Sequence, residues 1–194
     1  MSKVVIILGM HRSGTSCLAG ILERAGVDLG EVARQSLFNP RGNRENKRIM
    51  DLNNALLDFN RGSWNNPPAQ VTWPEGMKKE RDAIIRGYKN SPCWGFKDPR
   101  VLLTLEGWLE GLSGHAVAFA ATFRHPLAVA QSLYHRNQIP VEKGLSLWKT
   151  YNEKLLTQYA AMHFPVISFD LPGPGYREKV AVMLKQLSLH SDSR

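Results

Sequence analysis

The fold is decided by the stretch Val4-Val5-Ile6-Ile7-Leu8-Gly9-Met10-His11-Arg12-Ser13-Gly14-Thr15-Ser16. Its first five residues are apolar and four of them are β-branched, which predicts a buried strand of a parallel sheet. The segment 17–25 continues with apolar residues at helical spacing. A glycine loop between a strand and a helix directs backbone N–H groups toward one point, at the positive end of the helix dipole. The stretch therefore predicts a site for an anion, with phosphate as the best match.

The loop differs from a nucleoside-triphosphate-binding loop at one decisive position. Gly9 and Gly14 have the spacing of the Walker A pattern, but Thr15 stands where that pattern requires a lysine. That lysine contacts the β- and γ-phosphates of ATP or GTP. The nearest cation here is Arg12, two residues before the second glycine. The loop is thus suited to holding a phosphate but is not built for ordinary ATP or GTP hydrolysis.

Two motifs resemble those of a known family. The segment His11-Arg12-Ser13-Gly14-Thr15-Ser16 resembles the 5′-phosphosulfate loop of sulfotransferases that use 3′-phosphoadenosine 5′-phosphosulfate (PAPS), which commonly reads P-K/R-S-G-T-T/S. Farther along, Arg124 follows an apolar strand, and Ser132 comes eight residues later in the next helix. This pair resembles the 3′-phosphate motif of the same family, and ATP has no 3′-phosphate.

The resemblance implies a donor site and a reaction. The chain is expected to move a sulfuryl group from PAPS to a hydroxyl acceptor by in-line transfer, to release 3′,5′-bisphosphoadenosine (PAP), and to need no metal. The residues implied for the donor are His11, Arg12, Ser13, Gly14, Thr15, Ser16, Arg124 and Ser132.

Catalysis of sulfuryl transfer requires cations and a base. Arg12 and Lys97 are the candidates for stabilising the sulfuryl group and the leaving oxygen. The segment Lys97-Asp98-Pro99 resembles one in the tyrosylprotein sulfotransferases, and Glu45 resembles an acidic position of bacterial relatives with a G-M-H-R-S-G-T-S loop. For the base, Glu45 is slightly favoured over Asp98, with Glu31 and His11 as rivals. Each carboxylate also has a plain structural interpretation, as a helix cap or a solvated charge.

The remaining chain alternates apolar strands with amphipathic helices. Further strands are expected to begin after residue 92 and to span 115–123 and 166–169. Helices are expected over 45–59, 74–89, 102–109 and 126–136, with another that begins at 140. After a break at 173–175, a last helix is expected near 180–187. This pattern predicts a three-layer α/β fold resembling P-loop NTPases, as a single domain over 1–194 with a central parallel sheet of four to five strands. The Lys97–Arg100 tetrad and Arg124 both follow strands, so they are expected to meet the glycine loop at the carboxyl edge of the sheet.

The composition and charge of the chain indicate which kinds of ligand and partner it can bind. The chain has 194 residues and a net charge of +8, and its pI is about 9.7, which suits an acidic ligand. The basic residues are scattered, so a nucleic-acid partner is not expected. We also expect no membrane span, no structural disulfide, no metal site and a cytoplasmic location. The oligomeric state is not indicated.

Several alternatives stay open. The late glycine-rich loop with which many sulfotransferases cover the nucleotide is not found, and Pro172–Arg177 is a poor substitute. A P-loop kinase of a small molecule and a non-catalytic module that binds phosphonucleotides or polyanions are therefore alternative functions. The acceptor is expected to be a small molecule or a glycan. The segment 64–74 is either a lid or a structural loop anchored by tryptophan.

Overall fold

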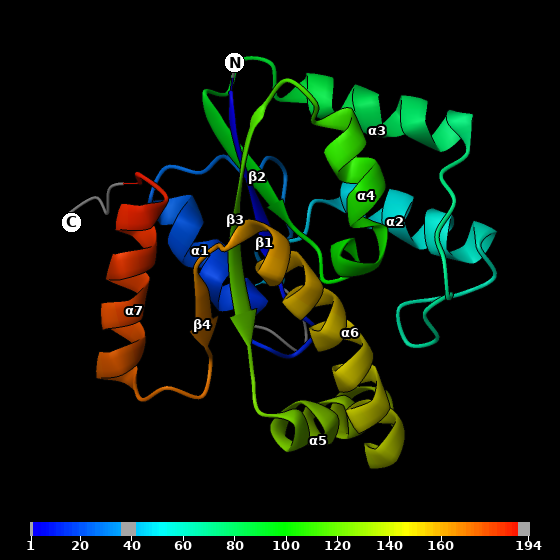
Figure 1. Cartoon of the computed structure of the whole chain (residues 1–194), viewed down its shortest axis with the longest axis vertical. Helices are drawn as coiled ribbons and strands as arrows, with labels where there is room; N and C mark the ends of the chain where they lie inside the picture. Colours follow the sequence, from blue (N-terminus) through cyan, green and yellow to red (C-terminus); the bar gives the residue numbers. More distant parts are fainter. Residues whose placement is uncertain (1, 36–41, 190–194) are drawn as a thin grey trace.

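The structure, a computed structural model, describes residues 2–35 and 42–189. Along the chain the elements are β1 (Lys3–Leu8), α1 (Thr15–Arg24), α2 (Lys47–Phe59), α3 (Glu75–Gly87), β2 (Cys93–Lys97), α4 (Val101–Gly111), β3 (Ala116–Phe123), α5 (Pro126–Asn137), α6 (Val141–Met162), β4 (Val166–Ser168) and α7 (Gly173–Gln186) (Figure 1). None of the helices in these two ranges has both the length and the apolar composition needed to cross a membrane.

The sheet is parallel throughout, with the strand order β2-β1-β3-β4. The strand predicted from the opening stretch, β1, is paired on both sides: Ile7 lies opposite Lys97 of β2 and opposite Ala120 of β3. Because all strands run the same way, their carboxyl ends lie at one edge (Figure 1). The predicted parallel sheet is confirmed, with four strands in the described part of the chain.

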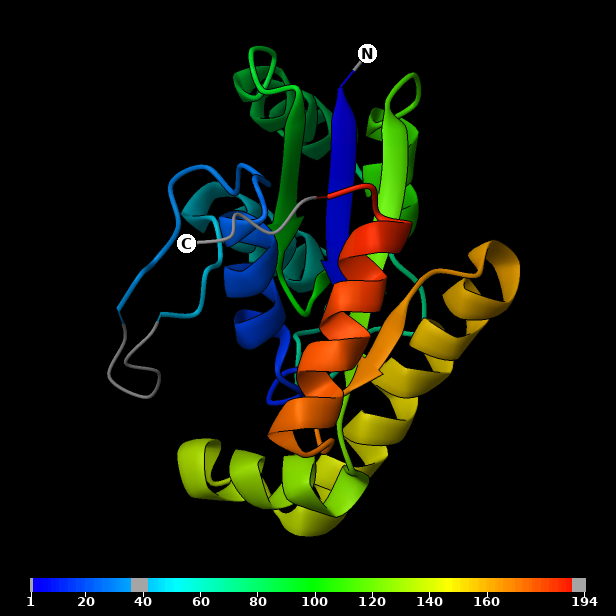
Figure 2. The ribbon, with the colours of Figure 1, turned by 90° about the vertical axis from the view of Figure 1, so that its left-hand side faces the viewer.

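Helices cover both faces of the sheet, which gives the predicted three layers. On one face, Val5 and Ile7 pack with residues of α1 and α7, and these two helices lie side by side (Figure 2). On the other face, Ile6 and Leu8 pack with residues of α2, α4 and α6. Alternate residues of β1 thus face opposite cores, as the two-residue period of a strand requires. The α/β, P-loop-NTPase-like fold predicted from the sequence is confirmed.

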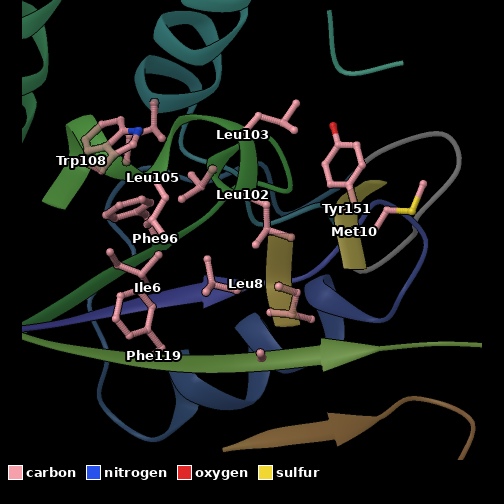
Figure 3. Close-up of a cluster of buried hydrophobic side chains, with 14 of the residues drawn as sticks. Ile6, Leu8, Met10, Phe96, Leu102, Leu103, Leu105, Trp108, Phe119 and Tyr151 are labelled. Atoms are coloured by element: carbon pink, nitrogen blue, oxygen red, sulfur yellow. The ribbon is translucent and has the colours of Figure 1, made fainter. Parts of the chain in front are cut away.

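The hydrophobic core between the sheet and helices α2, α4 and α6 fixes the segment that connects β2 to α4. Figure 3 shows Phe96 of β2 beside Trp108 of α4 and, near the end of the sheet, Tyr151 of α6 close to Met10. The rings of Phe96 and Trp108 lie 4.9 Å apart, and both side chains are almost completely buried. This packing holds α4 against the sheet and so fixes the turn of residues 98–100, which connects β2 to α4.

Two element predictions needed correction. The first helix begins at Thr15, two residues before the predicted start. The glycine-rich segment 173–175 opens α7 rather than breaking the chain, because Pro174 lies in the first turn, where its missing N–H costs no hydrogen bond. Residues 64–74 lie outside helices and strands, as predicted. The sequence also predicts a turn over 39–43, from its proline and glycine, and a frayed tail over 191–194; residues 39–41 and the tail lie outside the described residues.

Candidate functional site

The glycine loop takes a backbone conformation that few residue types adopt. Gly9 and Gly14 have φ values of 145° and 86°, and Arg12 has a φ of 67°. A Cβ on Gly9 would lie 2.5 Å from the carbonyl oxygen of Thr122 on β3, so only glycine fits against the neighbouring strand. A positive φ is uncommon for a residue with a side chain and often marks a functional position. The loop therefore holds Arg12 in a strained conformation directly before α1.

A cavity of about 440 Å³ lies at the carboxyl edge of the sheet, in front of this loop. Its wall is formed by the loop, by α1, by residues 42–45, by the ends of β2 and β3, by α5 and by Phe169 after β4. Segments distant in sequence thus meet where the sequence pattern placed a site. The candidate residues that line this cavity are His11, Arg12, Gly14, Thr15, Ser16, Glu45, Lys97 and Arg124.

Lys97 occupies the centre of a hydrogen-bonded group. Its Nζ donates to Oε1 of Glu45 at 2.6 Å, to the carbonyl oxygen of Asn43 at 3.2 Å and to Oγ of Ser16 at 3.4 Å. The hydroxyl of Ser16 donates to the same carbonyl at 3.1 Å. The ammonium of Lys97, from β2, thus lies at the start of α1, near the position where the Walker A pattern has its lysine.

The segment around Asn43 is held over α1 by a second ion pair. Arg44 contacts Glu23, and its side chain covers Gly20 so closely that a Cβ there would lie 2.8 Å from Nε. The bond from Lys97 to Glu45 therefore links β2 to a segment that is itself attached to α1. Both members of that pair are largely buried, with side chains 4% and 12% exposed.

Arg124 and Ser132, the two residues of the second motif, both lie beside Arg12. Nε of Arg12 donates to Oγ of Ser132 at 2.8 Å, and Nη1 of Arg124 donates weakly to the carbonyl oxygen of Arg12 at 3.5 Å. These residues line a second hollow that adjoins the main cavity. Burial lowers the pKa of Arg12, and the nearby charges of Arg136 and Arg124 lower it further. The carboxylate of Asp170, 3.5 Å from Nε of Arg124, balances one of these charges, and a bound anion would balance that of Arg12.

Three candidates, Ser13, Asp98 and Glu31, line neither the cavity nor the adjoining hollow. The side chain of Ser13 is fully buried, and its carbonyl oxygen accepts a hydrogen bond from Oγ1 of Thr122 at 3.0 Å. Its buried hydroxyl has no hydrogen-bond partner among the described residues, and Ser13 does not line the cavity. Asp98 is 1% exposed, and both of its oxygens are engaged, one by Asn53 and one by Arg100. This buried carboxylate holds Arg100 in position and does not line the cavity, so it cannot take a proton from a hydroxyl bound there. The rival Glu31 is exposed and does not line the cavity.

His11 forms an aromatic corner of the cavity. Its ring lies 4.5 Å from that of Trp64 and 6.0 Å from that of Tyr151. Burial lowers the pKa of His11 well below 6.5, and the charges of Arg100 and Lys97 lower it further. The imidazole is therefore neutral at pH 7. Neither ring nitrogen has a hydrogen-bond partner within residues 2–35 and 42–189.

Some lining residues were not predicted. Asn43 acts through its backbone carbonyl, which no side-chain pattern reveals, and Arg136 is a single arginine near the end of α5. Phe169 packs on the loop, where a Cβ on Gly14 would lie 2.1 Å from its ring. No three His, Cys, Asp or Glu side chains converge as metal ligands in the part of the chain that the structure describes.

The buried histidine makes stability depend on pH. The unfolded chain binds a proton at His11 below about pH 6.5, whereas the folded protein resists that proton because its pKa is lowered. The neutral His11 therefore lowers the free energy of unfolding only below about pH 6.5. The decrease is up to about 1.4 kcal/mol for each pH unit below that value. In urea titrations between pH 7 and 5, His11→Phe is expected to lose less unfolding free energy than wild type. The exposed-site control His135→Gln should follow wild type; equal losses in all three proteins would contradict the prediction.

Comparison with known proteins adds information on the fold. No model of a protein family matches this chain, and no curated protein sequence matches it. Among solved structures, the chain is similar to a gluconokinase from Sinorhizobium meliloti 1021, with a TM-score of 0.50 and 14% identity, over 96% of this chain and 93% of that chain. At this identity the likeness shows a shared α/β fold.

Proposed function

We propose that this protein is a sulfotransferase that moves a sulfuryl group from PAPS to a hydroxyl acceptor. The observation that carries the proposal is the meeting of Arg12, Arg124 and Ser132 in a hollow beside the glycine loop. PAPS has two phosphate groups that need separate sites, and the loop and this hollow offer two adjacent ones. The hollow has no use in binding ATP, which lacks the 3′-phosphate.

The proposed transfer is a single in-line displacement. The acceptor oxygen forms a bond to sulfur while the bond from sulfur to the bridging phosphate oxygen breaks, and that electron pair leaves with PAP. Charge grows on the bridging oxygen, so cations beside the loop stabilise the transition state. Arg12 and Lys97 serve this purpose. Glu45 lines the cavity next to Lys97, and its carboxylate takes the proton of the acceptor hydroxyl.

The proposal is tested by measuring the preference for a 3′-phosphate. In calorimetric titrations we expect PAP to bind more tightly than ADP, and Arg124→Ala to lose about 1.5–3 kcal/mol of PAP binding, the value of a hydrogen bond to a charged group. ADP binding should change little in that variant. The control is Arg86→Ala, which removes an exposed arginine of α3. Equal binding of PAP and ADP by wild type would rule out PAPS as the donor.

Phosphoryl transfer from ATP to a small molecule is the second candidate, and the likeness to a gluconokinase favours it. The position of Lys97 beside Ser16 also weakens the objection that the loop lacks its own lysine. The two candidates are separated by incubating the protein with acceptor mixtures and either PAPS alone or ATP with magnesium. Sulfated products support the first and phosphorylated products the second. Tight PAP binding with neither product supports a non-catalytic binding module.

A further inference from the structure

We propose that the acceptor is a hydroxy acid, and that Arg100 binds its carboxylate at the end of the cavity lined by His11 and Trp64. This inference rests on the proposed function in one respect: it assigns Arg100 and Trp64, which the donor motifs do not include, to the acceptor of the transferred group, and it moves His11 from the donor to the acceptor.

Arg100 has hydrogen-bonding capacity left over. Its side chain lines the cavity and is 11% exposed. Nη1 donates to Oδ1 of Asp98 at 2.8 Å, whereas the buried Nε has no partner among residues 2–35 and 42–189. A buried donor without a partner costs free energy, and in native proteins it calls for an explanation. A planar guanidinium with unused N–H groups at a cavity wall is suited to binding a carboxylate.

A buried network fixes the orientation of this arginine. Nδ2 of Asn53 donates to Oδ2 of Asp98 at 2.9 Å. Oδ1 of Asn53 in turn accepts from Oγ1 of Thr104 and from Nε1 of Trp108, each at 3.0 Å. Burying an ion pair seldom stabilises a fold more than apolar side chains of the same volume. A buried network that orients one guanidinium at a cavity wall and leaves its Nε without a partner therefore points to a binding role.

The neighbours of Arg100 suit the rest of a hydroxy acid. His11 is neutral and has two unpartnered ring nitrogens, so it can accept a hydrogen bond from a hydroxyl and donate one in return. The indole of Trp64 offers a flat apolar surface next to it, and its backbone carbonyl is held by the hydroxyl of Tyr151 at 2.8 Å. Apolar surface, hydroxyl partner and carboxylate partner thus lie together.

The charge of the cavity agrees with an anionic acceptor. Among the described lining residues Glu45 is the one acidic side chain, and it is paired with Lys97. The basic lining residues are Arg12, Arg24, Arg44, Lys97, Arg100, Arg124 and Arg136. A neutral acceptor would leave the free N–H groups of Arg100 without an anionic partner in the cavity. A carboxylate would accept hydrogen bonds from these groups.

The test compares matched probes that differ in one carboxylate. The pairs are methyl β-D-glucuronide with methyl β-D-glucoside, and 4-hydroxyphenylacetate with 4-hydroxyphenethyl alcohol. Binding to the full chain is measured by NMR titration, with and without saturating PAP. We expect the carboxylate form of at least one pair to bind roughly tenfold or more tightly, as for hydrogen bonds to charged groups. Arg100→Met should abolish this preference and keep PAP binding within about twofold.

Controls separate the possible failures. The exposed Arg48→Met on α2 should retain the preference. If Arg100→Met does not fold, Asp98→Asn/Arg100→Met removes both charges of the buried pair and takes its place. No preference in either pair, or a preference unchanged in the arginine variant, overturns the inference. If wild type does not bind PAP but still binds the carboxylate probe more tightly than its neutral partner, the proposed donor is refuted and the carboxylate site is supported.

Discussion

Replacing Lys97 with methionine is expected to lower kcat for group transfer by about 10²–10³-fold, the usual effect of removing one group that stabilises developing charge. Methionine keeps most of the length and the apolar stem of lysine, so packing at the end of β2 is retained. The loss comes from the ammonium, which lies beside Ser16 and Glu45 at the start of α1. Release of PAP from PAPS, in the presence of the best acceptor, measures the rate.

Two measurements control for the fall in kcat of Lys97→Met: the affinity of that variant for PAP, and the kcat of a variant at an exposed lysine. PAP affinity, measured by calorimetry, should fall far less than kcat, because the ammonium acts mainly on charge that develops during transfer. Lys89→Met, at an exposed position after α3, should keep the rate of wild type. A kcat for Lys97→Met within about twofold of wild type would remove Lys97 from the catalytic role, since loss of a stabilising group costs far more.

Replacing Asp98 with alanine is expected to lower the free energy of unfolding by about 3–5 kcal/mol, the cost of breaking a buried ion pair from one side. The variant leaves the guanidinium of Arg100 without its counter-ion and Nδ2 of Asn53 without its acceptor. Neither group reaches bulk water easily, because Asn53 is fully buried and Arg100 nearly so. Urea unfolding followed by circular dichroism measures the change.

An exposed ion pair provides the comparison. Asp51 pairs with Lys47 on the surface of α2, and Asp51→Ala should cost less than about 1 kcal/mol. The double variant Asp98→Asn/Arg100→Met should recover part of the loss, because no unpaired charge stays buried. If Asp98→Ala is no more destabilising than Asp51→Ala, the buried network does not hold Arg100 in the way described.

The parts of the molecule that local patterns determine were predicted well. The run from Val4 to Leu8 and the glycine after it were enough to predict β1 as a buried strand of a parallel sheet, followed by a loop and a helix. The order of strands and helices then placed Lys97 and Arg124 at the same edge, where they are found. PAPS as donor and Glu45 as base stay predictions.

Partners set by distant segments were not predicted. The bond between Lys97 and Glu45 depends on how residues 42–45 fold back over α1, and that path is fixed by Arg44 and Glu23. Asp98 was a candidate base because the segment Lys97-Asp98-Pro99 resembles one in the tyrosylprotein sulfotransferases. Its side chain turns toward Asn53 on α2, and only the tertiary packing of α2 against α4 shows this.

The cavity draws its residues from positions as far apart as 11 and 169, after the ends of all four strands, so it is complete only once β1, β2, β3 and β4 have paired. Such long-range parallel pairing is completed late in folding. A nucleotide that binds this cavity therefore has no affinity for partly folded chains and shifts the equilibrium toward the complete fold. Mass action gives about 2.7 kcal/mol of added stability at ~100 times the Kd. A rise in melting temperature with nucleotide concentration is thus a direct measure of affinity, and it requires no knowledge of the acceptor.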